Sequence, residues 1–161
     1  MRQIFFILLF FTAFLFACEK DLDVYSGDSG IFFYAGSRLN DTVAISWGMQ
    51  SGNVKTQNLT LRVLLLGEVV NYDRKFTIDV IADQADTLSA EEGIDYEPVT
   101  TEHVIPADGA YTDINIVLKR RSDLNERNRR FTVKLNETSE LKFLYSRQTR
   151  LDSVTVLDMD Y

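Results

Sequence analysis

The sequence predicts an all-β chain folded as a single antiparallel β-sandwich, and three observations support this prediction. Apolar and polar residues alternate at a period of two over most of the chain, as they do in half-buried strands. Clusters of Gly, Asp, Asn and Ser separate the alternating segments, as they do at turns. No long segment combines the helical period with helix-capping residues. About seven short strands at such a spacing are typical of a sandwich.

The expected strands follow one another from residue 30 towards the C-terminus. They are, in order, Gly30–Tyr34, Thr42–Trp47, Leu59–Leu65, Phe76–Val80, Ile114–Leu118, Phe131–Leu135 and a last strand that contains Val154 and Val156. The clearest turn clusters lie at residues 27–30, 50–53 and 107–109. Trp47 shares a strand face with Val43 and Ile45, which predicts that its ring lies in the core.

The composition limits the chemistry that the chain can support. With 161 residues, 45% of them hydrophobic, the chain has enough material for one globular domain. A single Cys and a single His exclude an intramolecular disulfide, a Cys-based zinc site and a multi-His metal site. The formal charge of −7 argues against a nucleic-acid-binding face, which is normally basic. We therefore expect no cofactor, no metal and no nucleic-acid partner.

The N-terminal stretch predicts a lipoprotein signal peptide at residues 1–17. Arg2 precedes thirteen residues that are apolar except for Thr12, a run too short to span a bilayer but suited to a signal peptide. The following Leu15-Phe16-Ala17-Cys18 resembles a bacterial lipobox. Cys18 would then become the first mature residue and carry acyl chains, such as palmitate, that anchor the protein in outer-membrane lipid. The alternative is an ordinary hydrophobic helix with a buried Cys.

Residues 18–28 form the expected tether between this anchor and a sandwich domain at residues 29–161. The polar segment Glu19–Asp23 resembles the signal that directs Bacteroidetes lipoproteins to the outer face of the outer membrane. The protein is thus expected to be lipid-anchored and to face outside the cell. The alternative is that the segment is a plain solvated linker.

A loop motif gives the chain a resemblance to known sandwich domains. The matching residues, which resemble the signature loop of Calx-beta domains, are Ser89, Ala90, Gly93, Asp95 and Tyr96. Weaker matching pieces are Val104–Gly109, Asp73-Arg74, Leu118-Lys119-Arg120 and Asp123-Leu124. Together with the lipobox, they resemble a Bacteroidetes surface lipoprotein family with a domain of unknown function (DUF4843-like).

The resemblance implies a fold, a context and possible partners. It implies an immunoglobulin-like, Calx-beta-like sandwich over about Tyr25 to Leu144. It also implies an association with starch-utilisation-type transporters and their glycan-binding lipoproteins. Members of the family usually continue past the sandwich, which implies that this chain is a short or a truncated member.

The loop motif also has an explanation that does not depend on the family. Gly93 is the expected position of a positive φ angle. Asp95 can accept hydrogen bonds from loop N–H groups, as Asx side chains do. Tyr96 is expected to bury its ring and to bond its hydroxyl to the backbone, as in the tyrosine corner of sandwich folds. These residues are therefore expected to be structural rather than functional.

A basic stretch near the end of the chain has three possible roles. Its cationic residues are Lys119, Arg120, Arg121, Arg127, Arg129 and Arg130. They could form a solvated hairpin paired with the acid-rich residues 83–97, a docking face for an acidic partner, or a contact for lipopolysaccharide or a polyanionic glycan. Calcium-binding Calx-beta domains have acidic residues in the corresponding loop, so the basic residues here predict no specific calcium site.

Other residues carry weaker signals of function. Glu91, Glu92 and Asp95 supply carboxylates, but glycoside hydrolysis also needs a cleft between two of them, which small sandwiches seldom offer. His103, beside two apolar residues, is expected to be a structural histidine. Thr87, in Asp86-Thr87-Leu88, resembles a Bacteroidetes O-glycosylation site. The aromatic candidates for sugar stacking are Trp47, Tyr34, Tyr72, Tyr111 and Tyr145.

These observations predict a non-catalytic outer-membrane surface lipoprotein. We expect it to be an accessory binding or assembly module of a glycan-uptake system. The alternative is a purely structural envelope module that has no glycan ligand, and a hydrolase is a distant third.

Overall fold

The computed structural model describes residues 28–34, 42–48, 50–82, 88–121, 129–143 and 152–159. These residues form eight strands and no helix. The strands are β1 (Gly30–Tyr34), β2 (Thr42–Ser46), β3 (Thr56–Leu66), β4 (Arg74–Ile81), β5 (Glu102–Ile105), β6 (Tyr111–Lys119), β7 (Arg129–Asn136) and β8 (Ser153–Met159). In this part of the chain, no helix is long and apolar enough to span a membrane.

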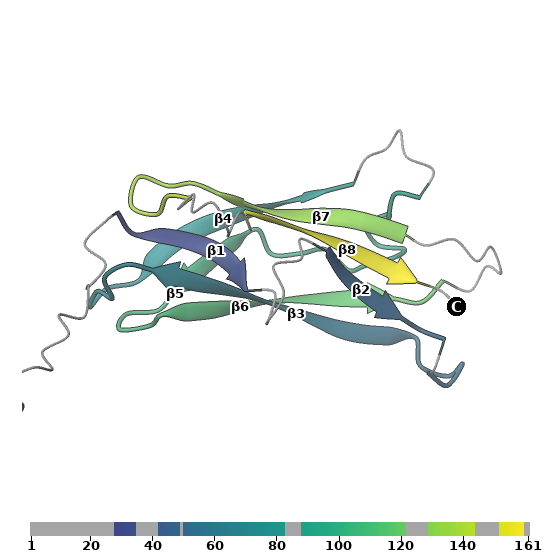
Figure 1. Ribbon diagram of the computed structural model, residues 1–161. Helices are drawn as coiled ribbons and strands as arrows, with labels where there is room; N and C mark the ends of the chain where they lie inside the picture. The colour runs from purple at the N-terminus through teal and green to yellow at the C-terminus, as the bar shows by residue number, and fades with distance from the viewer. Residues whose placement is uncertain are drawn as a thin grey trace, which may run out of the picture.

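The strands form two sheets that pack face to face (Figure 1). Sheet A has the order β1-β3-β6, and sheet B has the order β2-β8-β7-β4-β5. In Figure 1, β7 and β8 of sheet B lie above β3 and β6 of sheet A. This two-layer arrangement confirms the β-sandwich that the alternating pattern predicted.

One strand pair departs from the antiparallel pattern. β2 pairs with β8 in parallel, with Thr42 opposite Thr155 and Ser46 opposite Met159. Parallel neighbours need a long connection, and here nearly the whole domain lies between the two strands. The alternation of residues in β2 predicts a strand but contains no information about its direction in the sheet.

The strand β5 was not among the expected strands. It has four residues and pairs with the start of β4, with Arg74 opposite Ile105. Its two apolar residues, Val104 and Ile105, are adjacent rather than alternating, so the period-two signal is missing. The Pro106–Gly109 turn follows at once, and Asp73 Oδ1 accepts a 2.8 Å hydrogen bond from the Ala107 N–H.

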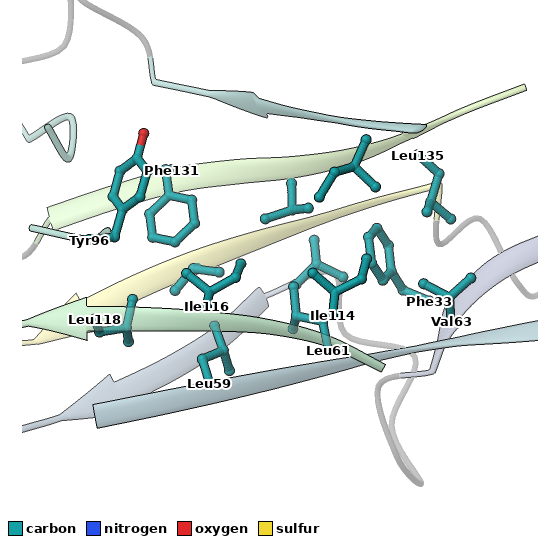
Figure 2. Close-up of a cluster of buried hydrophobic side chains, with 14 of the residues drawn as sticks. Phe33, Leu59, Leu61, Val63, Tyr96, Ile114, Ile116, Leu118, Phe131 and Leu135 are labelled. Carbon is teal, nitrogen blue, oxygen red and sulfur yellow. The ribbon is translucent and has the colours of Figure 1, made fainter. Parts of the chain in front are cut away.

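The core lies between the inner faces of the two sheets. Figure 2 shows side chains of β3 and β6 pointing towards Phe131 and Leu135 of β7. Sheet A contributes Ile31, Phe33, Leu59, Leu61, Val63, Ile114, Ile116 and Leu118, and sheet B contributes Phe76, Ile78, Ile105, Phe131, Val133, Leu135, Val154 and Val156. Burial of each large side chain contributes about 1.5–3 kcal/mol. Trp47 is 1% exposed, which confirms that it is a core residue.

Candidate functional site

The loop that contains the Ser89–Tyr96 motif is folded by its own hydrogen bonds. Gly93 has a φ of +83°, as expected, and its N–H donates to the Tyr96 carbonyl oxygen at 2.7 Å. Asp95 is 3% exposed, and its Oδ2 accepts a 2.7 Å hydrogen bond from the Glu91 N–H. The backbone N–H of Asp95 donates back to the Glu91 carbonyl oxygen at 2.8 Å. These contacts close a compact turn around a buried carboxylate.

Tyr96 packs its ring at the edge of the core. The ring stacks on that of Phe131, with centroids 4.5 Å apart and an interplanar angle of 25° (Figure 2). Burial, followed by the charges of Glu92 and Asp95, raises the pKa of the Tyr96 phenol, which therefore stays neutral near pH 7. Among the described residues, no hydrogen bond from its hydroxyl to the backbone is found, so the tyrosine-corner bond stays a prediction. Tyr96 is held by this ring stacking and by the hydrogen bond that its carbonyl oxygen accepts from the Gly93 N–H.

The first residues of the motif pair with β7. Arg130 donates its N–H to the Leu88 carbonyl oxygen and accepts the Ala90 N–H at its own carbonyl oxygen, both at 2.9 Å. Ala90 is buried, so a small side chain fits this position. The Ser89 hydroxyl is also buried, and no hydrogen-bond partner lies within the described residues.

The basic stretch and the acid-rich loop meet at the end of β6. The Arg121 guanidinium binds the Asp95 carboxylate in a bidentate manner, with Nε donating to Oδ1 and Nη2 donating to Oδ2 at 2.8 Å. The Arg121 Nη2 also lies 3.8 Å from Glu91 Oε2. Lys119 Nζ donates to the Gly93 carbonyl oxygen at 3.2 Å and lies 3.8 Å from Glu97 Oε1. Lys119 and Arg121 thus pair with described residues of the acid-rich loop, as in the first of the three roles considered above.

The remaining cations of the stretch have other surroundings. The Arg120 guanidinium lies 6.0 Å from the centroid of the Trp47 ring and 3.4 Å from the Ser51 carbonyl oxygen. Arg129 and Arg130 begin β7. Arg127 lies outside the described residues, as do the lipidation candidate Cys18, the glycosylation candidate Thr87 and Tyr145. Docking of an acidic partner on this stretch stays a prediction.

The contacts of His103 are those of a residue that supports the fold. Its ring stacks on that of Phe76, with centroids 5.6 Å apart, and its Nε2 lies 2.7 Å from the Thr100 carbonyl oxygen. Burial lowers the pKa of His103, and the hydrogen bond to Thr100 partly opposes this shift. No group of three or more His, Cys, Asp or Glu side chains that could hold a metal is found among the described residues.

The outer face of sheet A gathers aromatic residues from its two outer strands, β1 and β6, on either side of β3. The cross-strand register places Phe32, Leu64 and Tyr111 in one row. The next row contains Tyr34, Arg62 and Asp113, and the one after it contains Thr60 and Asn115. Tyr34 is 52% exposed and Tyr111 is 50% exposed, while Phe32 and Leu64 are half-buried. We call these eight residues the sheet-A face; they alternate along the strands with the residues that point into the core.

An ion pair occupies the centre of the sheet-A face. Arg62 donates from Nε to Asp113 Oδ1 at 2.7 Å and from Nη2 to Oδ2 at 2.9 Å, and its guanidinium carbon lies 4.4 Å from the Tyr111 ring centroid. This hydrogen-bonded pairing lowers the pKa of Asp113 and raises the pKa of Arg62. Both groups are therefore charged near pH 7, and their charges cancel locally.

The outer face of sheet B has a different character. Its central rows carry threonines and opposite charges, with Thr132 opposite Thr155 and Asp79 opposite Lys134. The exposed apolar residues of this sheet, Ile81 and Val104, lie on different strands and in different rows. Sheet A is thus the sheet whose outer face presents neighbouring aromatic rings.

The sequence predicted only part of this surface. Tyr34 and Tyr111 were candidates for sugar stacking, and Tyr72, which is 51% exposed, lies in the loop before β4 instead. Arg62 and Asp113 were missed because they are 51 residues apart in the sequence and only the strand register brings them together. The sequence did contain one signal of this pair, because Arg62 and Asp113 carry opposite charges at polar positions of two strands in which polar and apolar residues alternate.

Comparisons with solved structures agree with the sandwich fold. The apo-form Calx CBD1 domain has a TM-score of 0.60 and 13% identity, covering 84% of this chain and 99% of that chain. A Bacteroides ovatus protein described as a "putative carbohydrate binding protein" has a TM-score of 0.53 and 10% identity, covering 81% of this chain and 36% of that chain. A second Bacteroides ovatus protein, of unknown function, has a TM-score of 0.54 and 15% identity, covering 81% of this chain and 44% of that chain.

These similarities establish the fold alone, because all identities are low. The chain spans less than half the length of either Bacteroides ovatus protein. No curated protein matches the chain. A family model described as a domain of unknown function, DUF4843, matches residues 25–158, which include every strand but the last residue of β8. Because this match covers most of the sequence, the chain belongs to the DUF4843 family.

Proposed function

We propose that the protein is a non-catalytic carbohydrate-binding module that binds its ligand on the sheet-A face. The observation that supports this proposal is the pair of half-exposed tyrosines, Tyr34 and Tyr111, on either side of β3. The C–H groups on one face of a pyranose ring can pack on an aromatic ring through dispersion and removal of apolar surface from water. Tyrosine serves this purpose well because its ring is rigid and its hydroxyl stays hydrated.

Polar groups next to the rings can bind sugar hydroxyls. The Thr60 hydroxyl donates to Asn115 Oδ1 at 2.8 Å, and the Arg62–Asp113 pair lies in the adjacent row. Apolar stacking combined with a few placed polar groups is the usual composition of a small-molecule site. The similarity in fold to a protein described as carbohydrate-binding is in keeping with this proposal but does not establish it.

We propose further that the module is an accessory of a glycan-uptake system at the outer face of the outer membrane. This proposal rests on the lipobox-like Leu15–Cys18 segment and on the family resemblance, which together suggest a starch-utilisation-type transporter and its glycan-binding lipoproteins as partners. Cys18→Ala should abolish lipidation and release the protein from the membrane fraction. Unchanged membrane fractionation of this variant would contradict the anchoring.

Affinity electrophoresis in gels that contain soluble polysaccharides tests carbohydrate binding. At least one polysaccharide should retard the wild-type protein, and the Tyr34→Ala/Tyr111→Ala variant should lose about tenfold or more in affinity. Tyr72→Ala is the matched control, because Tyr72 is equally exposed but lies outside the sheet-A face. Thermal unfolding of each variant checks that the fold is retained.

Two outcomes would contradict the proposal. In one, no polysaccharide retards the wild-type protein, which favours a purely structural envelope module. In the other, the double tyrosine variant binds as tightly as the wild type, which moves the binding site away from the sheet-A face.

A further inference from the structure

We infer that the sheet-A face selects neutral polysaccharides over acidic ones, and that Asp113 determines this selection. The inference rests on the proposed function, because it concerns the ligand class of the same face. It follows from the way in which the charges on the face are already paired, from the spacing of its aromatic rings and from the polar groups that surround them.

The cation between the two tyrosines is already bound to a carboxylate. Both oxygens of Asp113 accept hydrogen bonds from Arg62, through Nε at 2.7 Å and Nη2 at 2.9 Å. The planar guanidinium fork is the group that usually recognises a carboxylate in this bidentate way. A uronic acid that approached Arg62 would have to displace Asp113 and would also be repelled by it. The pair therefore discriminates against anionic sugars.

The position of the Arg62 side chain is fixed on a second side. Its guanidinium carbon lies 4.4 Å from the centroid of the Tyr111 ring, which is cation–π distance. The guanidinium is thus held between the ring and the Asp113 carboxylate. The sheet-A face therefore presents to a ligand an ordered polar centre that has no net charge and is flanked by aromatic rings.

The spacing of the two tyrosines fits an extended chain of sugars. Tyr34 and Tyr111 lie two strands apart and one row apart in the register. With strand spacings of about 4.8 Å and a two-residue step of about 6.7 Å, their Cα atoms are separated by roughly 12 Å. This Cα separation exceeds the width of one pyranose ring, so the two residues can contact different sugars of one chain that crosses the strands. An open sheet face of this kind suits a polysaccharide better than a monosaccharide.

The polar groups beyond the ion pair are uncharged. The next row of the face consists of Thr60 and Asn115, which are exposed and hydrogen-bonded to each other at 2.8 Å. Hydroxyl and amide groups both donate and accept hydrogen bonds, as sugar hydroxyls do. A neutral glycan can therefore exchange hydrogen bonds with this row, whereas a carboxylate finds no unpaired cation between the two tyrosines.

The experiment compares retention by a neutral polysaccharide series with retention by polygalacturonate in affinity gels. The wild-type protein should be retained by a neutral polysaccharide and not by polygalacturonate. Asp113→Asn keeps the shape of the side chain but releases the positive charge of Arg62, so it should gain about tenfold or more in affinity for polygalacturonate. High salt should abolish this gain, because it depends on an exposed charge. Adding Arg62→Gln to Asp113→Asn should remove the gain as well.

Asp79→Asn is the matched control for the loss of a surface carboxylate. Asp79 lies opposite Lys134 on the outer face of sheet B, so this variant changes the net charge equally without changing the sheet-A face. It should not gain affinity for polygalacturonate. An equal gain in Asp79→Asn would show a general charge effect and overturn the inference.

The remaining outcomes separate this inference from the proposed function. If the wild-type protein binds polygalacturonate as well as or better than neutral glycans, and Tyr34→Ala/Tyr111→Ala abolishes that binding, the selectivity inference fails and the carbohydrate-binding proposal stands. If the wild-type protein binds neither class, the carbohydrate-binding proposal itself fails. If it binds neither class and sedimentation shows a dimer that the tyrosine variant disrupts, the sheet-A face is a self-association surface and both fail.

Discussion

Replacing Asp95 with Ala should lower the free energy of unfolding by about 3 kcal/mol, because the change removes a buried carboxylate that two groups bind. The Glu91 N–H loses its 2.7 Å hydrogen bond, and the Arg121 guanidinium loses its bidentate carboxylate. Breaking a fully buried ion pair costs about 3–5 kcal/mol. The Arg121 side chain is 18% exposed, so water can partly replace Asp95, which places the expected loss at the lower end of that range.

Removing the cation instead of the carboxylate tests the other partner of this ion pair. Arg121→Ala leaves the Asp95 carboxylate, which is 3% exposed, without its cation, although the Glu91 N–H still binds it. The destabilisation should therefore be similar to that of Asp95→Ala. In the double variant the two effects should not add, and we expect a coupling free energy of about 2 kcal/mol.

Urea denaturation followed by circular dichroism measures all three variants. Glu92→Ala is the control, because Glu92 is an exposed carboxylate of the same loop and should change stability by no more than about 0.5 kcal/mol. Wild-type stability in Asp95→Ala, or strict additivity in the double variant, would show that the pair does not stabilise the loop. Loss of a measured glycan with unchanged stability would instead make the loop a binding site.

Three further predictions concern other parts of the molecule. Tyr96→Ala should cost about 3 kcal/mol because it leaves a cavity against Phe131, whereas Tyr96→Phe should be nearly neutral in urea denaturation; a large loss in Tyr96→Phe would reveal an essential hydroxyl contact. Because burial lowers the pKa of His103, the unfolded chain takes up this proton first as the pH falls through about 6.5, so stability is lost below that pH. His103→Gln should lack this contribution in denaturation curves at neutral and mildly acidic pH, and parallel curves for the two proteins would refute it. Millimolar calcium should not raise the melting temperature, because Arg121 already occupies the Asp95 carboxylate; a rise of several degrees, or micromolar affinity in calorimetry, would contradict this.

The strands of the core were predictable because burial imposes a local pattern. In β3, Leu59, Leu61 and Val63 point inward and alternate with outward-facing residues, so the sequence shows both the strand and its buried face. β5 could not be found in this way, because its apolar residues are adjacent. The parallel direction of β2 was not predictable either, since it depends on which distant strand pairs with it.

The loop motif shows the same limit at the level of single residues. The positive φ of Gly93 and the role of Asp95 as a hydrogen-bond acceptor follow from the properties of those residues, and the structure shows both. The partner of Asp95 does not follow, because six cations of the basic stretch were equivalent in the sequence. The docking of residues 95–97 along the end of β6, where Lys119 N–H donates to the Asp95 carbonyl oxygen, brings Arg121 into reach.

The residues that the fold leaves unexplained indicate where function lies. The buried apolar side chains lie on the inner faces of the two sheets, where β1 contributes Ile31 and Phe33. The alternate residues Phe32 and Tyr34 face outward, and Tyr111 joins them from β6 across the register. Folding gains little from an aromatic residue at a half-exposed position, where threonine or lysine would serve as well, as on the outer face of sheet B. Single exposed apolar residues are common, but here the exposed Tyr34 and Tyr111 adjoin the half-buried Phe32 and Leu64, and neighbouring apolar residues form the kind of patch that marks binding surfaces. Core packing does not explain the residues of the sheet-A face, whereas binding of a ligand does.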